Sequence, residues 1–352
     1  MIHMADQLDQ EIQKYRQAVR ENPEDAEAHL MLGVVYSVMG NYDDSIKELE
    51  ETIRLDPGNV DAHLNLGITY DIMGRVDDAI SEYKEAKKLD RSNVEVRLNL
   101  ANAYVENGNI NEALPEFKEL IEINPDLPGA YLSFGIALTC AGYADDAMDM
   151  YREALKLDPD SYEGHSLLAS LMADMGNIDG AINEYKTAIK SNPEYADSYY
   201  NLGVLLAEKG EIDLAMEYYR LAIAKDPEFF ESHYNMGLLL DEKGLLYDAI
   251  QEYKEAIRIY PEFTDAHNWL GAAYRRIGLM DESVKEFNRA IEIDPQYAIA
   301  HNGLGITYFE MGRLEDSVGE FKAALRIDPG YLDAQNNLKL IEAKKASGGQ
   351  PQ

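Results

Sequence analysis

Six of the seven histidines recur at intervals of 34 residues or a multiple of it, at His29, His63, His165, His233, His267 and His301. Because imidazole nitrogens are common Zn²⁺ ligands, such a column suggests a metal site. Two histidines on one ion need their nitrogens within about 2.1 Å of it. Neighbouring helices, in contrast, pack about 10 Å apart. The spacing therefore favours packed or half-buried histidines, and we expect neither a metal nor another cofactor.

No other arrangement of residues predicts catalysis. The sequence contains no phosphate-binding glycine loop, no paired cysteines and no nucleophile motif. Its one cysteine, Cys140, excludes an intrachain disulfide and fits a reducing compartment. We therefore expect a protein that is not an enzyme and that works in the cytoplasm.

The charge balance restricts the class of partner. The chain has 32 basic and 65 acidic residues, a net charge of −33. Nucleic acids are bound through Lys/Arg surfaces, so we expect no nucleic-acid partner and a preference for cationic ones. No apolar run approaches the roughly 18 residues of a membrane span, and the first ten residues lack the basic and apolar regions of a secretory signal.

Glycine and proline repeat along the whole chain with the same 34-residue period. The glycines are Gly40, Gly74, Gly108, Gly142, Gly176, Gly210, Gly244, Gly278 and Gly312. The prolines are Pro23, Pro57, Pro125, Pro159, Pro193, Pro227, Pro261, Pro295 and Pro329, with Arg91 in the one missing place. A fixed period of this length predicts a stack of identical units in one elongated array rather than two globular domains.

Residues 60–93 show how one unit should fold. Apolar residues at helical spacing lead up to Gly74, which suits a left-handed helix end. A second helix should follow, with Ala79 and Tyr83 on its buried side. Numbering each unit from 1, small residues recur at positions 8 and 20 and an aromatic ring at position 24 in eight of nine units. This pattern predicts a closely packed helix A and helix B in each unit.

The unit resembles the tetratricopeptide repeat in its length, its small residues, its aromatic ring and its proline at position 32. Nine repeats begin at residues 26, 60, 94, 128, 162, 196, 230, 264 and 298 and together span 26–331. Residues 1–25 resemble a lone helix B, residues 332–345 a capping helix A, and residues 346–352 a disordered tail. The resemblance implies an all-α, right-handed superhelical solenoid of antiparallel helix pairs.

In that family, positions 2, 5, 6, 9, 12 and 13 of helix A face a concave groove. Positions 5 and 9 give an apolar floor of Leu30, Val34, Leu64, Ile68, Leu98, Leu132 and Ile136, followed by Tyr200 and Tyr234. An exposed apolar strip of this kind marks an interaction site. The alternative is that these side chains pack against neighbouring A helices and show little surface.

Polar and aromatic residues add further candidates for partner binding. Position 6 carries Asn65, Asn99, Asn201 and Asn235, a pattern similar to the asparagine ladder of O-linked sugar transferases, and Asn102 lies at position 9. Repeat 8 differs from the rest in carrying Trp269, Arg275 and Arg276, with Asn268 and Asn302 beside them. Trp and Arg often anchor interfaces. The arginines could instead pair with acids of the neighbouring repeats, such as Asp241 or Glu310.

Acidic residues should line one edge of the groove. They occupy position 2 and are Glu27, Asp61, Glu95, Glu163, Asp197, Glu231 and Asp265. These side chains could attract a cationic partner, or they could only interact with the positive end of the helix dipole. Seven glutamates at position 23, such as Glu48 and Glu252, are expected to be solvated side chains on helix B.

These observations predict a non-catalytic scaffold that binds an amphipathic, Lys/Arg-bearing protein segment in its concave groove. A first alternative is a self-assembling structural scaffold, a homo-oligomer formed through the N-terminal helix. A second is the repeat arm of a larger enzyme such as an O-linked sugar transferase. For residues 5–22 we favour a cap on the chain's own repeat 1 over docking on a second copy.

Overall fold

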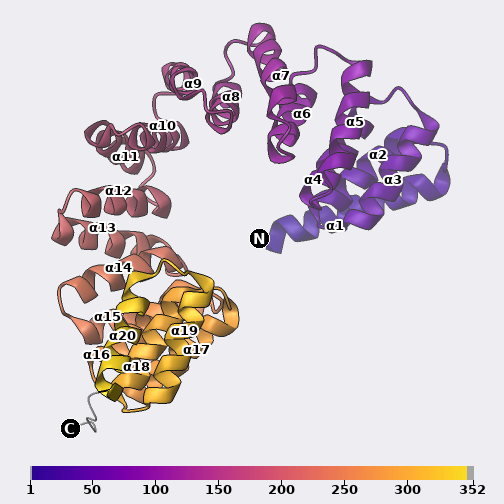
Figure 1. Cartoon of the computed structure of the whole chain (residues 1–352). Helices are drawn as coiled ribbons and strands as arrows, with labels where there is room; N and C mark the ends of the chain where they lie inside the picture. Colours follow the sequence, from indigo (N-terminus) through magenta and orange to yellow (C-terminus); the bar gives the residue numbers. More distant parts are fainter. Residues whose placement is uncertain (1, 347–352) are drawn as a thin grey trace. The chain divides into compact units, whose positions relative to one another are not determined.

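The computed structural model describes residues 2–346, which form α-helices joined by short turns, with no strand among them (Figure 1). The A helices are α2 (Ala26–Val38), α4 (Val60–Ile72), α6 (Val94–Glu106), α8 (Pro128–Cys140), α10 (Tyr162–Asp174), α12 (Ala196–Glu208), α14 (Phe230–Glu242), α16 (Thr264–Arg276) and α18 (Ala298–Glu310). The B helices are α3 (Tyr42–Leu55), α5 (Val76–Leu89), α7 (Ile110–Ile123), α9 (Ala144–Leu157), α11 (Ile178–Ser191), α13 (Ile212–Lys225), α15 (Leu246–Ile259), α17 (Met280–Ile293) and α19 (Leu314–Ile327).

The glycine of each repeat ends helix A in the predicted way. Gly74 has φ +71°, and its N–H donates to the Asp71 carbonyl at 2.9 Å, while Arg75 N–H reaches back to the Tyr70 carbonyl at 2.9 Å. A residue with a Cβ is strained at such a φ, which explains why glycine occupies this place. The turn that follows lets helix B fold back along helix A.

Helices A and B approach closely because position 8 is glycine in seven repeats and alanine in the other two. A Cβ added to Gly67 would lie 2.4 Å from the ring of Tyr83, which is fully buried at position 24. Ala79 at position 20 is also fully buried. The predicted combination of small residues at positions 8 and 20 with a ring at position 24 is therefore confirmed in this repeat.

The chain divides into two compact units, Met1–Glu184 and Tyr185–Gln352, which we call unit 1 and unit 2. Inside each unit, A helices of neighbouring repeats contact one another, as α2 and α4 do in unit 1 and α16 and α18 in unit 2. We call the surface formed by positions 2, 5, 6, 9, 12 and 13 of these helices the A-helix face.

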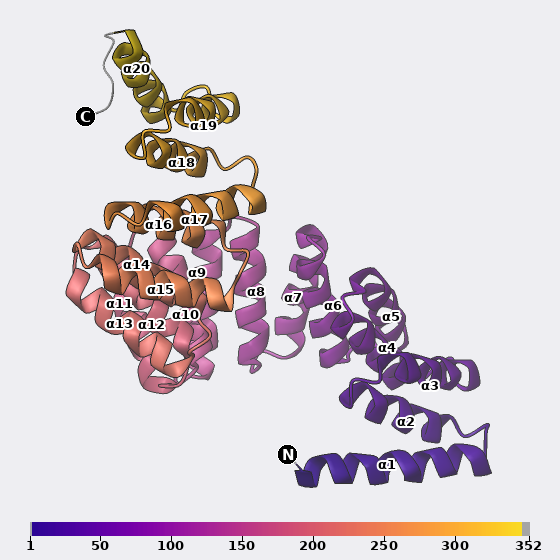
Figure 2. The ribbon, with the colours of Figure 1, turned by 90° about the horizontal axis from the view of Figure 1, so that it is seen from below.

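Two further helices cover the ends of the array (Figure 2). Helix α1 (Ile2–Glu21) packs on α2 through Ile12, which is buried against a cluster that includes Tyr36. At the other end, Ile341 of α20 (Leu332–Ala346) is buried beside Phe321 of α19. The expected disordered tail, residues 346–352, begins at the last residue of α20, Ala346, and its residues 347–352 lie outside the described range. No helix among the described residues is long and apolar enough to cross a membrane.

Candidate protein-binding surface

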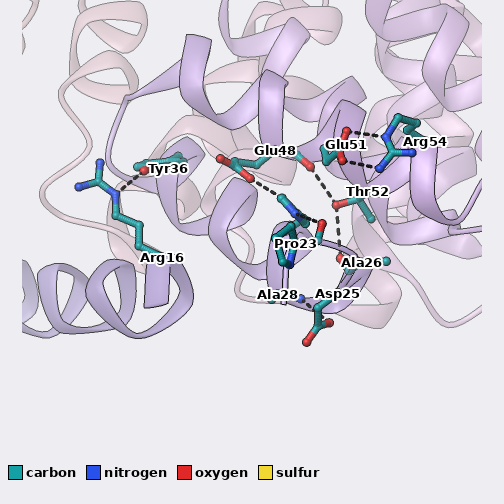
Figure 3. A network of polar contacts seen from close by, with 11 residues as sticks. Arg16, Pro23, Asp25, Ala26, Ala28, Tyr36, Glu48, Glu51, Thr52 and Arg54 are labelled. Carbon is teal, nitrogen blue, oxygen red and sulfur yellow. Dashed lines mark hydrogen bonds and ion pairs between the residues drawn. The ribbon is translucent and has the colours of Figure 1, made fainter. Parts of the chain in front are cut away.

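A polar bridge at position 4 fixes seven of the nine A helices against their own helix B. In repeat 1, His29 Nδ1 lies 2.5 Å from Glu48 Oε2 of α3, and His29 Nε2 lies 3.1 Å from the carbonyl oxygen of Pro23. Figure 3 shows this network, with its two labelled partners, Glu48 on α3 and Pro23 in the turn before α2. The bridge ties helix A to its own helix B and to the preceding turn.

The pairing with the position-23 glutamate recurs wherever position 4 is His or Arg, and the contact with the preceding turn recurs at Arg97, His165 and His267. The further pairs are His63–Glu82, Arg97–Glu116, His165–Glu184, His233–Glu252, His267–Glu286 and His301–Glu320. The six histidines are buried or half-buried, as predicted. Among residues 2–346, no three His, Cys, Asp or Glu side chains come close enough to hold a metal ion.

The interpretation of the position-23 glutamates as solvated side chains was wrong. Their carboxylates accept hydrogen bonds from position 4, because helix B lies directly against that side of helix A. A sequence signal for this existed and was missed. In the two repeats with tyrosine at position 4, Tyr131 and Tyr199, position 23 is no longer glutamate but Met150 and Tyr218.

In unit 1, the predicted apolar floor is only partly exposed. Leu30 and Leu64 at position 5 are 6% and 5% exposed, so the alternative of packing against neighbouring helices holds there. Val34 and Ile68, one helical turn further along, are half-buried. Leu98 and Leu132 are half-buried too, and Ile136 is exposed. Apolar surface therefore increases toward the C-terminal ends of these helices.

The most exposed apolar residues of this face had not been predicted. Val38 and Ile72, at position 13 of repeats 1 and 2, are 66% and 54% exposed, and the adjacent Met39 and Met73 are 36% and 38% exposed. Position 13 of the later repeats carries Glu106, Cys140, Asp174, Glu208, Glu242, Arg276 and Glu310. That contrast along one column of the sequence could have revealed this surface.

Acidic groups lie at both ends of the A helices that carry this apolar surface. Glu27, Asp61 and Glu95 are exposed at the other end of the helices, and Glu163 is exposed in repeat 5. At the near end, Asp71 accepts a hydrogen bond from the Tyr83 hydroxyl at 2.7 Å. Burial raises the pKa of Asp71, and the nearby charge of Glu106 raises it further.

In unit 2, polar pairs between neighbouring A helices occupy much of the same face. Asn235 Nδ2 donates to Tyr200 Oη at 3.1 Å, and Arg275 Nη1 donates to Glu310 Oε1 at 2.7 Å. Arg276 pairs with the buried Asp241. The alternative that both arginines form ion pairs between repeats is therefore correct. Asp197, Glu231 and Asp265 are half-buried here, and Asp265 accepts from the Tyr297 hydroxyl.

Trp269 remains exposed within this occupied face, at 39%. Burial raises the pKa of the nearby Tyr234 to about 12. Asn268 and Asn302, predicted to help bind a partner, are buried. Asn302 Oδ1 accepts from Asn337 Nδ2, 35 residues later, at 3.1 Å. Asn268 has no equivalent partner, because the residue 35 positions later is Gly303, and its Oδ1 accepts no hydrogen bond.

The asparagine column at position 6 does not offer a row of free amides. Asn65 Nδ2 donates to the Asp61 carbonyl of its own helix at 2.7 Å, and Asn235 is engaged with Tyr200 as described. Asn99 and Asn201 are half-buried, while Asn102 at position 9 is exposed. The sequence predicted the column but not the use of two of its amides inside the chain.

Family profiles match the chain along most of its length. Profiles described as tetratricopeptide repeat match residues 4–63 and 72–133, residues 35–94 and 166–228, and residues 298–331. A profile described as TPR repeat matches residues 242–278 and 278–312. The chain therefore belongs to the tetratricopeptide repeat family, whose members act as protein-interaction scaffolds.

Several solved structures are similar. A chain in the crystal structure of the APC/C hetero-tetramer Cut9–Hcn1 is 17% identical, with a TM-score of 0.54, over 93% of this chain and 80% of that one. PilF from Pseudomonas aeruginosa is 19% identical, with a TM-score of 0.53, over 59% and 95%. MamA is 31% identical over 49% and 93%, with a TM-score of 0.43. The first two likenesses show the fold. The search of curated protein sequences finds no match.

Proposed function

We propose that this protein is a non-catalytic cytoplasmic scaffold that binds an amphipathic, Lys/Arg-bearing protein segment on its A-helix face. The observation that carries the proposal is the exposed apolar surface of unit 1 within a chain of net charge −33. The apolar side of a partner can cover this exposed apolar surface. The nearby carboxylates favour cationic side chains at the edges of that partner.

The self-assembly alternative has less support. It requires the apolar side of α1 to leave its own chain and reach a second copy. Leu8, Tyr15 and Val19 of α1 already pack, with Ile12, on the buried surface of α2. Removing them would expose that surface again, at about 25 cal/mol for each Å² of apolar area. The sugar-transferase alternative is weakened because Asn65 and Asn235 donate to acceptors within the chain.

A pair of designed peptides tests the proposed function. One is a helical peptide of about five turns with leucine on one face and lysine on the other, and its twin carries glutamate in place of lysine. Fluorescence anisotropy with the full chain should show binding of the lysine peptide that weakens as salt rises from about 0.05 M to about 0.5 M, because salt screens charge attraction. Equal binding of the glutamate twin, or binding of neither, would refute the proposal.

A further inference from the structure

We infer that the partner segment docks as an α-helix across repeats 1 and 2, on two apolar ridges at the C-terminal ends of α2 and α4. This inference rests on the proposed function and gives it a location and a partner geometry. Ridge 1 is Leu30, Val34 and Val38, and ridge 2 is Leu64, Ile68 and Ile72. Each ridge follows one side of its helix, since residues four apart stand above one another.

The two ridges form a shaped surface rather than scattered exposed side chains. Along each ridge, exposure rises from the buried leucine through a half-buried residue to the exposed Val38 or Ile72. Met39 and Met73 extend the apolar area at the exposed end. Methionine side chains are flexible and polarisable, so they can adapt to the side chains of a partner.

The spacing of the ridges fits the period of a helix. Neighbouring packed helices lie about 10 Å apart, and α2 and α4 are in contact. Residues seven apart on an α-helix are separated by about 10.5 Å along its axis. A helix lying across α2 and α4 can therefore place one apolar residue on ridge 1 and a second apolar residue, seven positions away, on ridge 2. This geometry selects a partner whose apolar residues recur at that interval.

Charge specifies the flanks of this partner. The ridges end at the C-termini of α2 and α4, which carry the negative ends of the helix dipoles. Asp71 and the exposed Glu106 lie near the end of ridge 2. Arg75, which follows Gly74 in the turn after α4, is already paired with Asp78 at 2.6 Å. Lysine or arginine beside the apolar residues of the partner would therefore meet unneutralised negative charge.

Unit 2 cannot offer the same surface. Position 13 is charged in repeats 6 to 9, as Glu208, Glu242, Arg276 and Glu310. Two of these residues, Arg276 and Glu310, already form ion pairs between repeats. A helix laid there would have to bury these charges, which costs more than the apolar contact returns.

The decisive variant is Val38→Glu combined with Ile72→Glu in the full chain. Glutamate already occupies this position in Glu106, Glu208 and Glu242, so the fold accepts it. The probe is the lysine peptide, with its leucines seven residues apart. We expect its affinity to fall at least tenfold while the urea unfolding midpoint stays unchanged. Val38→Ala with Ile72→Ala should give a smaller loss in the same direction.

Two controls separate the possible sites. Trp269→Ala alters the exposed aromatic of unit 2, and Leu89→Glu places the same charge on another exposed apolar residue of unit 1. Neither should change the affinity by more than about twofold, well below the tenfold change that about 1.4 kcal/mol produces. Loss of binding in Trp269→Ala with retention in the double glutamate variant would overturn this inference and leave the proposed function standing.

A second copy of the chain is the rival occupant of the ridges. If wild-type mass by light scattering grew with concentration, and the double glutamate variant stayed monomeric, the ridges would be a self-association surface and the inference would be wrong. If the wild-type chain bound neither peptide, the proposed function itself would fail. Hydrogen exchange should show protection by the lysine peptide in α2 and α4 and not in α14 and α16.

Discussion

Unit 1 and unit 2 build the same helix pair but secure the start of helix A differently. In unit 1, polar side chains cap it in four of the five repeats, the exception being α8 after Leu127, and Asn59 Oδ1 does so by accepting from Ala62 N–H at 2.9 Å. The same cap is made by Asp25, Asn93 and Ser161. In unit 2 the corresponding residues are aromatic and make no such cap, and Phe263 instead meets Tyr234 edge-on, with ring centroids 4.8 Å apart.

Both solutions contribute about the same stability but leave different surfaces. A cap is worth about 1 kcal/mol and an aromatic pair about as much. The cap is local and leaves the A-helix face untouched. The aromatic ring covers position 5, and polar pairs such as Asn235–Tyr200 join the next helix. In unit 2, aromatic contacts and polar pairs within the chain thus occupy much of the A-helix face, whereas unit 1 leaves the two ridges available to a partner.

The first test of this comparison removes a polar pair of unit 2. Arg276→Met leaves the buried carboxylate of Asp241 without its cation, and we expect unit 2 to lose about 2–3 kcal/mol. Trp269 is the one tryptophan of the sequence and lies on α16 together with Arg276, so its fluorescence reports unfolding at this site directly. The matched change in unit 1 is Glu106→Met at the same position of repeat 3.

Glu106 is exposed, so Glu106→Met should change stability by less than about 0.5 kcal/mol, measured by urea unfolding with far-UV circular dichroism. Similar losses in the two variants would show that position 13 has the same role in both units. The comparison would then be wrong on this point.

The internal packing of the repeat was predictable because it depends on residues within one unit. Gly74, Gly67 and Tyr83 each have one local steric role, and the structure confirms these roles. The bridges of position 4 were not predicted because each column was interpreted alone. The pairing of His29 with Glu48 becomes visible only when positions 4 and 23 are compared repeat by repeat.

The binding face was harder to predict because exposure depends on the neighbouring repeat. Position 5 seemed to offer apolar surface, yet Leu64 is buried by the packing of consecutive A helices. The surface of Val38 and Ile72 was missed because position 13 was not examined for a change of polarity along the chain. Polar pairs such as Arg276–Asp241 join residues of different repeats, which a reading of single units cannot assign.

A second test examines what the two units share. Gly67→Ala would place a Cβ 2.4 Å from the buried ring of Tyr83, and Gly237→Ala would place one 2.6 Å from the buried ring of Tyr253. Each should cost about 1–2 kcal/mol, since overpacking exceeds the gain in helix propensity. Hydrogen exchange would locate each loss in its own repeat. Markedly unequal losses would mean that the units differ in their cores as well as in their faces.

A third test gives unit 2 a residue of unit 1. Asn268→Leu removes a buried carbonyl oxygen that has no donor and introduces the leucine found at position 5 of the first four repeats. We expect unit 2 to gain about 1 kcal/mol in urea unfolding followed by Trp269 fluorescence. Asn302→Leu is the matched control and should destabilise, because it leaves Asn337 without its acceptor. A loss of stability in Asn268→Leu would show that this amide has a partner.

The smallest effect concerns position 12, where both units have a buried or half-buried aspartate. Asp241 is neutralised by Arg276, whereas Asp71 receives only the hydroxyl of Tyr83, and burial raises its pKa. A raised pKa means that the folded state holds the proton more firmly than the unfolded state, so the contribution of Asp71 to stability decreases as pH rises through that pKa.

Asp71→Asn keeps an acceptor for Tyr83 and removes the charge. Stability at pH 7 should rise by roughly 0.5 kcal/mol, and this gain should shrink as pH falls toward about 4, where the wild-type carboxyl is protonated. Urea midpoints of both proteins across this range measure the effect. Asp241→Asn should have the opposite sign at pH 7, because it removes the partner of Arg276, and a gain in both variants would mean that the ion pair of unit 2 contributes nothing.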